Sequence, residues 1–452
     1  METKRENFGS KIGVIAAAAG SAIGLGNIWR FPYVAGENGG AAFLLVYLVF
    51  VVGIGVPVML SEFVIGRRAQ SNPVGAFKRL APKSLWPFAG FVGITAAFTI
   101  LAFYTTVAGW TLEYLYLTLA GGFDKADKAG LTSQFSSFIS SGPRPMFWQM
   151  IFMVMTAYIV LKGVKNGIEK YNKILMPLLF GILILLVIRS LTLPNSFEGV
   201  HFLFAPDFSK INAEVLLQAL GQSFFSLSIG MGTLITYGSY INKKDNLSST
   251  AFSVSVADTL VAVLAGMAIF PAVFAFGITP EAGPSLVFIT LPMIFSQMAG
   301  GQFFEIIFFV LLAIAALTST ISVLEVVVAY LSEELKLSRA KSTLIAAGSI
   351  SVLGILCTLS QGPLPKLSIG GMNLFDILEA TSATILLPLG GLFIVIFVGW
   401  VMKKETVFAE ITNEGSLKGR LKMLYLIIIR FIAPVAIALV FLNGVGIFGY
   451  GG

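Results

Sequence analysis

The residues best suited to chemistry lie in a glycine-rich stretch near the start of the chain, residues 19–33. Its hydrophobic segment is long enough to cross a bilayer, yet it contains the helix breakers Gly20, Gly24, Gly26 and Pro32. Glycine lowers helix propensity by about 1 kcal/mol relative to alanine, and proline removes a backbone donor. Unpaired backbone groups at membrane depth are tolerated only where they are buried in protein or line a cavity. Since Asn27 and Arg30 lie beside the break, the pattern predicts a binding site; the alternative is that the glycines only allow close helix packing.

A second interruption follows about two hundred residues later, over residues 222–232. It repeats the pattern of small hydroxyl residues followed by Gly-x-Gly, at Gly230 and Gly232. Interrupted helices at matching positions of two halves indicate a transport site at mid-membrane depth. The N-terminus of a half-helix offers N–H groups to an anion, and its C-terminal carbonyls can hold a cation. The two breaks therefore predict a carboxylate-like ligand together with a hard cation such as sodium.

A hard cation requires oxygen ligands, and polar residues inside the apolar segments provide them. Asn27 has a side-chain carbonyl, Ser226 a hydroxyl and Asp258 a carboxylate, and residues 318–320 read Thr-Ser-Thr. Ser and Thr in membrane helices commonly bond back to their own helix, so this alternative stays open for the hydroxyls. A carboxylate within a membrane span is costly and is functional by default.

Composition and hydropathy predict an all-α polytopic membrane protein. The 452 residues are 56% hydrophobic and only 12% charged, against about 25% charged in soluble domains. We expect a single transmembrane domain with eleven spans in a 5+5 inverted repeat, in which helices 1 and 6 are broken. The first repeat is expected at about 11–190, the second at about 214–401 and an extra helix at about 421–448.

The charge distribution predicts orientation. Most of the 30 basic residues fall in loops on one side of the expected spans. This places the protein in the cell inner (plasma) membrane with its N-terminus in the cytoplasm and, because there are eleven spans, its C-terminus on the external side. The net charge of +7 reflects this bias and not a nucleic-acid surface. Cys357 and His201 are the only residues of their types. Without a nucleophile–base pair, a metal cluster or a phosphate loop, the sequence does not favour an enzyme or an organic cofactor.

At this point the residues resemble the neurotransmitter:sodium symporter family, in particular its bacterial amino-acid transporters with the leucine-transporter fold. The resemblance covers essentially the whole chain. Its most specific motifs are KRE at 4–6, GSAIGLGNIWRFPY at 20–33 and ENGG at 37–40. Supporting matches are SFFSLSIGMG at 223–232, ITYGSY at 235–240, ITLP at 289–292 and LTST at 317–320.

The resemblance implies two sodium sites and one amino-acid site. The first sodium site would use Ala22, Asn27, Ser226, Asp258 and the carboxylate of the substrate. The second would use Gly20, Ile23, Ala315, Thr318 and Ser319. The backbone and hydroxyl contacts of the substrate would come from Ala22, Leu25, Gly26, Tyr104, Phe225, Ser226 and Ser228. Its side chain would meet Gly24, Ile100, Phe225, Met231, Thr320 and Val323, which are mostly apolar.

The resemblance also implies gate residues and a helix segment that change conformation during transport. Arg30 with Asp376 would form the outer gate, although lipid-interface snorkelling is an alternative for the arginine. Arg5 with Glu333 would form the inner gate, and Glu62 would support the sixth helix. Gly167 and Pro177 match a Gly-x9-Pro element at which the fifth helix unwinds; a simple proline kink is the alternative.

The sequence thus predicts a sodium-coupled symporter that imports a hydrophobic or aromatic L-amino acid by alternating access. Asp258 supplies a fixed negative charge, which favours chloride-independent transport and allows proton antiport on the return step. Gly24 stands where amine-carrying relatives have an aspartate, so the substrate must bring its own carboxylate. A sodium-dependent sensor that binds without translocating, and an ion channel, remain as alternatives. Partners are expected to be the amino acid and the bilayer, with neither nucleic acid nor an obligate protein partner.

Overall fold

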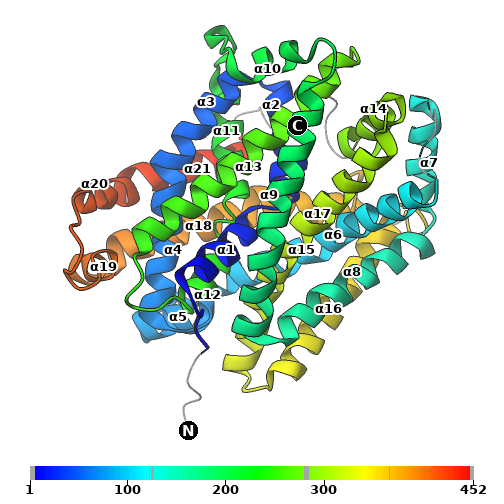
Figure 1. Cartoon of the computed structure of the whole chain (residues 1–452). Coiled ribbons are helices and arrows are strands. Elements are labelled where there is room, and N and C mark those ends of the chain that lie inside the picture. The colour runs from blue at the N-terminus through cyan, green and yellow to red at the C-terminus, as the bar shows by residue number, and fades with distance from the viewer. Residues whose placement is uncertain (1–5, 122, 124–126, 279–284, 366, 448–452) are drawn as a thin grey trace.

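Long helices make up most of the chain (Figure 1). The computed structural model describes residues 6–121, 123, 127–278, 285–365 and 367–447. Within them, nine continuous helical segments are long and apolar enough to cross a membrane. These are Ala41–Ala69, Pro87–Leu119 (α6), Pro143–Leu161 (α8), Val164–Leu191, Leu247–Ala275 (α13), Gly301–Glu334 (α15), Arg339–Ser360 (α16), Leu374–Val401 and Lys422–Gly444.

Two further crossings are broken. The first consists of α1 (Lys11–Ala22), a π-helical turn η1 (Gly26–Arg30) and α2 (Phe31–Glu37), with a bend of 54°. The second consists of α11 (Ala213–Ser226) and α12 (Thr233–Gly238). The described residues thus contain nine continuous candidate spans and the bent pair of the first crossing. Counting α11 and α12 as one further interrupted crossing gives eleven, in line with the sequence prediction.

Several crossings combine α-helical and π-helical pieces, and short elements connect them. The pieces are α3 (Ala41–Phe50), η2 (Val51–Gly55), α4 (Val56–Ala69), η3 (Val164–Glu169), α9 (Lys170–Leu191), α17 (Leu374–Ala380), η6 (Thr381–Leu386), α18 (Leu387–Ile396), η7 (Phe397–Val401), α20 (Lys422–Ile427), η8 (Ile428–Ile432) and α21 (Ala433–Gly444). The connecting elements are α5 (Pro73–Leu80), α7 (Lys128–Ser140), α10 (Ser196–Phe204), η4 (Phe208–Lys210), η5 (Leu286–Thr290), α14 (Leu291–Gln297) and α19 (Lys404–Ile411). Two short antiparallel strands, β1 (Ser368–Ile369) and β2 (Met372–Asn373), precede α17.

The broken crossings lie inside the bundle. Helix α1 packs against α9, α12, α13 and α15, and α11 packs against α3, α18 and α21. The most enclosed continuous crossings are α6 and α15, each with 78% of its apolar core segment buried, against 33% for the last crossing. Apolar side chains on the outer helices, such as Val154, Ile184 and Leu344, are exposed and suit contact with lipid. The interrupted helices are therefore shielded from lipid by a ring of intact ones.

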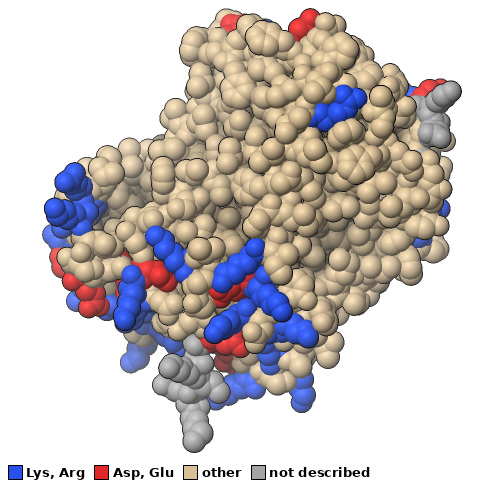
Figure 2. Space-filling view, viewed as in Figure 1, with Lys and Arg blue, Asp and Glu red and all other residues tan. Residues whose placement is uncertain are grey.

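Basic side chains gather at one end of the molecule. Figure 2 shows Lys and Arg concentrated at the end where α1 begins, while the rest of this face carries few charges. The exposed side chains at Lys78, Arg79, Lys162, Lys165 and Lys336 follow the loops that the sequence assigns to the cytoplasmic side. This end is called the inner end below, and the opposite one the outer end.

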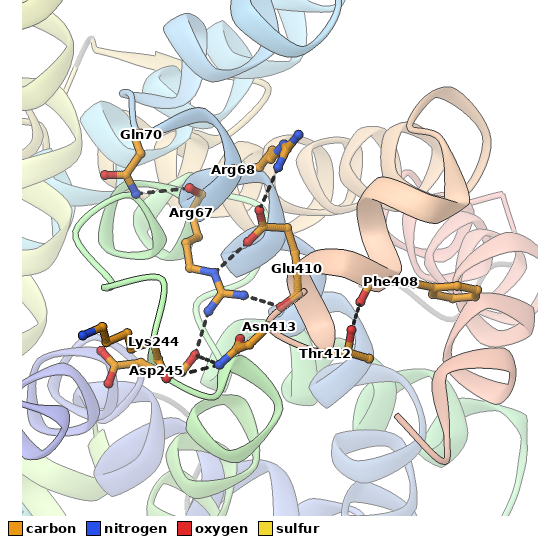
Figure 3. A network of polar contacts seen from close by, with 9 residues as sticks. All are labelled: Arg67, Arg68, Gln70, Lys244, Asp245, Phe408, Glu410, Thr412 and Asn413. Carbon is orange, nitrogen blue, oxygen red and sulfur yellow. Dashed lines mark hydrogen bonds and ion pairs between the residues drawn. The ribbon is translucent and has the colours of Figure 1, made fainter. Parts of the chain in front are cut away.

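A buried ion pair anchors the surface helix α19 to the bundle (Figure 3). Arg67, at the end of α4, is 1% exposed, and its Nε lies 2.8 Å from Oε2 of Glu410 on α19. The same guanidinium donates to the backbone carbonyls of Asp245 and Glu410. Asn413 donates to the carbonyls of Lys244 and Asp245 at 3.2 and 3.1 Å. One arginine thus links α4, α19 and the loop between α12 and α13.

Removing one partner of this pair is expected to destabilise the fold. Glu410→Ala leaves a buried, uncompensated guanidinium, which typically costs about 3–5 kcal/mol. The matched control is Glu405→Ala on the same helix, because Glu405 is 72% exposed and its ion pair with Lys404 spans 3.9 Å. We expect thermal unfolding in detergent to show a clear loss for Glu410→Ala and no change for Glu405→Ala. Equal melting temperatures for the two variants would contradict the anchoring role.

Candidate functional site

The break in the first crossing frees backbone carbonyls. In a continuous helix the Gly24 amide would bond to the Gly20 carbonyl, and the Leu25 amide to the Ser21 carbonyl. Here the Gly24 N–H donates to Asn27 Oδ1 at 3.1 Å, and the Leu25 N–H donates to the Tyr104 hydroxyl at 2.9 Å. The carbonyls at the end of α1 are therefore left for other partners, which is the condition for a cation site at a helix C-terminus.

The second break is set by left-handed backbone. Ser228, Gly230 and Gly232 have φ values of +54°, +91° and +77°, a region that glycine enters without a steric penalty. The Gly230 amide donates to Oε1 of Glu62, at 2.8 Å. Glu62 is fully buried in α4, so this carboxylate supports the non-helical segment as the sequence predicts.

A buried polar cluster joins the two breaks. Asn27 Nδ2 donates to Ser226 Oγ at 3.0 Å and to Asp258 Oδ1 at 2.7 Å. Ser226 Oγ lies 3.0 and 2.8 Å from the two carboxylate oxygens of Asp258. Tyr47 completes the cluster, with its hydroxyl 3.2 Å from Ser226 Oγ and 3.3 Å from Asp258 Oδ2. The structure thus brings together the side chains that the sequence assigns to the first sodium site, at the end of α1, where the backbone of Ala22 also lies.

A second group of oxygens lies between α1 and α15. Thr318 Oγ1 is 3.0 Å from the Ala315 carbonyl and 3.2 Å from that of Ile314. Ser319 Oγ contacts the Ser21 carbonyl at 3.5 Å. A Cβ added to Gly20 would lie 3.2 Å from Thr318 Cβ, so the two helices touch here. The residues expected at the second sodium site, Gly20, Ile23, Ala315, Thr318 and Ser319, are all buried along this contact.

The expected amino-acid pocket adjoins the first cluster. The Tyr104 hydroxyl and the Leu25 amide meet at one point, where both can contact a carboxylate. The Ser228 hydroxyl donates to the Ser21 carbonyl at 2.9 Å. Ile100, Met231 and Val323, which are expected to contact the substrate side chain, are each 4% exposed. Thr320 differs, because its hydroxyl bonds to that of Thr156 on α8 at 2.9 Å and its polar atom is engaged there.

Phe225 and Arg30 lie together at the outer side of this region. A Cβ added to Gly26 would lie 2.9 Å from the Phe225 ring, and the Arg30 guanidinium lies 4.5 Å from the centre of the same ring. Both residues line a pocket of about 420 Å³, which Leu25, Tyr104 and Glu379 line as well. This pocket therefore reaches the point where the Leu25 amide meets the Tyr104 hydroxyl.

The outer gate differs from the expected arrangement. Among the described residues Arg30 forms no ion pair with Asp376 and stacks on Phe225 instead. Glu379, one turn further along the helix, lines the same pocket and interacts electrostatically with both residues. Sequence reasoning missed Glu379, although its i,i+3 spacing from Asp376 puts both acids on one helix face. It also missed Tyr47, whose apolar sequence neighbours give no signal.

The inner end is closed by the segment that precedes α1. The Phe8 ring packs edge-on against Tyr237 and Tyr240 of the second break, at 5.7 and 6.0 Å. The Gly9 amide donates to Glu169 Oε2 at 2.6 Å, and the Val164 amide to Glu6 Oε2 at 2.6 Å. These contacts connect the N-terminal segment to α12 and η3.

The expected inner gate lies partly outside the description. Arg5 is not among the described residues, so its pairing with Glu333 stays a prediction. Glu333 Oε2 accepts hydrogen bonds from the Asn72 amide at 2.8 Å and from Ser71 Oγ at 3.1 Å.

The Gly-x9-Pro element spans a change of helix type. Gly167 lies in the π-helical turn η3, and Pro177 lies inside α9. A Cβ on Gly167 would come within 2.1 Å of the Ile159 carbonyl, so the close approach of α8 requires glycine there.

Comparison with known proteins agrees with this geometry. A family model described as the sodium:neurotransmitter symporter family matches residues 5–127 and 131–449. The chain is 41% identical to the sodium-dependent transporter YhdH of Bacillus subtilis, over 99% of this chain and 100% of the relative. It is 38% identical to a sodium-dependent transporter of Haemophilus influenzae, over 97% and 98% of the two chains.

A solved structure is also similar. The crystal structure of MhsT in complex with L-phenylalanine aligns with a TM-score of 0.90 and 49% identity, covering 98% of this chain and 100% of that one. The broken crossings, the eleven spans and these sequence matches agree with one another. The chain belongs to the sodium:neurotransmitter symporter family, whose members are transporters and not enzymes.

Proposed function

We propose that the protein is a symporter that imports a hydrophobic or aromatic L-amino acid with sodium, by alternating access. The observation that carries the proposal is the contiguity of three features. The Asn27–Ser226–Asp258 cluster, the Leu25 amide with the Tyr104 hydroxyl, and the mostly apolar pocket that Leu25 and Tyr104 line adjoin one another. A cation held by the cluster and a carboxylate held by the amide and the hydroxyl would be direct neighbours. The similarity to MhsT, which was crystallised with L-phenylalanine, supports the substrate class.

Coupling follows from this adjacency. A sodium ion in the first site gains a ligand from the carboxylate of the substrate, and the substrate gains a positive neighbour. Each therefore raises the affinity of the other by the same factor. An apolar side chain suits the pocket, because a polar one would leave buried groups unpaired at about 1–3 kcal/mol each. The second sodium site, formed by α1 and α15, would stabilise the bend of the first crossing.

The orientation is part of the proposal. We place the inner end in the cytoplasm of a bacterial inner (plasma) membrane and the C-terminus outside, on the basis of the gathered Lys and Arg side chains. Import then begins at the pocket beside Arg30 and Phe225 and ends when the N-terminal segment releases η3 and α12.

The first experiment is uptake of labelled hydrophobic amino acids into proteoliposomes. With an inward sodium gradient we expect concentrative uptake, and with potassium in its place none, because the substrate site is incomplete without sodium. Competition among phenylalanine, tryptophan, tyrosine, leucine and methionine identifies the substrate. Sodium-dependent binding without accumulation would instead support the sensor interpretation, and sodium-independent uptake would contradict the assigned sites.

Asp258 is expected to be essential for sodium use. Asp258→Asn keeps the shape but removes the charge, so the sodium concentration for half-maximal binding should rise at least about 10-fold, an effect of about 1.4 kcal/mol. Asp207→Asn, in an exposed loop, is the matched control.

Wild-type uptake should be unchanged when gluconate replaces chloride, since the fixed carboxylate of Asp258 supplies the negative charge.

An acidic vesicle interior should accelerate wild-type uptake if Asp258 carries a proton outward on the return step. The same acidic interior should not change uptake by Asp258→Asn.

Gly24 offers a test of the substrate site. A Cβ at Gly24 would lie 2.7 Å from the Tyr104 hydroxyl and 3.2 Å from Ser319 Cβ. Gly24→Ala should displace Tyr104 from the Leu25 amide and weaken amino-acid binding about 10-fold, as expected for loss of a hydrogen bond to a charged group. Gly221→Ala is the control, because its Cβ would meet nothing closer than 3.9 Å. Scintillation-proximity binding compares the two; unchanged affinity in Gly24→Ala would exclude this contact.

A further inference from the structure

Asn172, in the first turn of α9, carries an unused oxygen at a buried position. The residue is 0% exposed, and its Nδ2 donates to the Ile168 carbonyl at 2.8 Å. Its Oδ1 meets no hydrogen-bond donor among the described residues. A carbonyl can only accept, so the atom facing Ile168 must be the amide nitrogen, and this bond fixes which way the oxygen points. A buried carbonyl without a partner is unfavourable, so this oxygen requires an explanation.

The oxygen points at Gly20, one of the residues expected at the second sodium site. A Cβ added to Gly20 would lie only 2.1 Å from Asn172 Oδ1, and the same Cβ would lie 3.2 Å from Thr318 Cβ. Asn172 Oδ1 therefore lies against the end of α1, beside the hydroxyl-bearing face of α15. Gly20 is required at this position, because any side chain would occupy the space of the oxygen.

We propose that Asn172 Oδ1 is an additional oxygen ligand for the sodium ion of the second site, supplied by α9 on the inner side of that site. The inference rests on the proposed function, because it presupposes a sodium ion between α1 and α15. A side-chain carbonyl is a suitable ligand for a hard cation, and binding would satisfy the otherwise unpaired oxygen. Neither the motifs nor the resemblance assigned a ligand to this helix.

The position of Asn172 also suggests how it takes part in the release of sodium at the inner end. Glu169, one turn toward the inner end, accepts hydrogen bonds from the Gly9 amide and from Ser10 Oγ. Asn172 therefore stands between the second site and the contacts that close the inner end. When those contacts break, a sodium ion that leaves α15 is still held by Asn172 while water reaches it from the inner side.

The test measures the sodium dependence of amino-acid binding by the full-length protein, with sodium chloride against potassium chloride. Asn172→Leu removes the oxygen at similar size and should raise the half-saturating sodium concentration about 10-fold. Asn172→Asp replaces the carbonyl by a carboxylate and should lower that concentration, while uptake slows because sodium leaves less readily. A purely structural role would not give opposite shifts for the two variants. The control, Asn166→Leu, alters an exposed residue of η3 and should behave as wild type.

The outcomes separate this inference from the function on which it rests. If wild-type binding shows no sodium dependence, the proposed function itself is wrong. If wild-type binding requires sodium and Thr318→Ala weakens that requirement, but both Asn172 variants keep the wild-type sodium concentration, only the role of Asn172 is overturned. Should Asn172→Leu fail to fold, the direction of the shift in Asn172→Asp still decides the question.

Discussion

The structure depends on one constraint: backbone groups in the middle of a membrane protein must find partners even where the helix stops. At the first break, Asn27 and Tyr104 take the N–H groups of Gly24 and Leu25. Every amide diverted in this way frees a carbonyl one turn earlier. The freed Ser21 carbonyl accepts a hydrogen bond from Ser228 Oγ at 2.9 Å and lies 3.5 Å from Ser319 Oγ of α15. The interruption is thus stabilised by the same residues that are assigned to bind ligands, which explains why it is not repaired into a regular helix.

The two breaks are held together as one unit. Asn27 bonds to Ser226, Gln222 Nε2 donates to the Gly26 carbonyl at 3.3 Å, and Ser228 donates to the Ser21 carbonyl. Each bond joins one broken crossing to the other, without an intervening helix. A ligand that orders one break would therefore order the other, and a cation at the first cluster would affect the geometry at Gly20 and Thr318. The proposed coupling between sodium and substrate would rest on this physical continuity.

The sequence predicted the fold well because the membrane imposes strong rules. Apolar length gave the eleven spans, and glycines with Asn27 and Arg30 gave the position of the first break. Spacing in the chain could not show which side chains meet across helices, so Tyr47, Glu379 and the buried Asn172 went unnoticed. The Arg30–Asp376 pair stays a prediction. The stacking of Arg30 on Phe225 and the proximity of Glu379 in the described conformation are tertiary contacts that the sequence does not show. The roles assigned to the site residues remain predictions until binding is measured.

More contacts close the inner end of the protein than the outer end, and this difference indicates which conformation of the transport cycle the structure resembles. At the inner end, Glu6, Phe8 and Gly9 connect the N-terminal segment to η3 and α12 through hydrogen bonds and ring contacts. At the outer end, Arg30 stacks on Phe225 beside a pocket that extends to Leu25 and Tyr104. Moving a single side-chain stack disturbs less structure than detaching a segment from two elements. The described conformation is therefore nearer to one that accepts substrate from the outer end, and opening the inner end requires the loss of the contacts at Glu169 that lie one turn from Asn172.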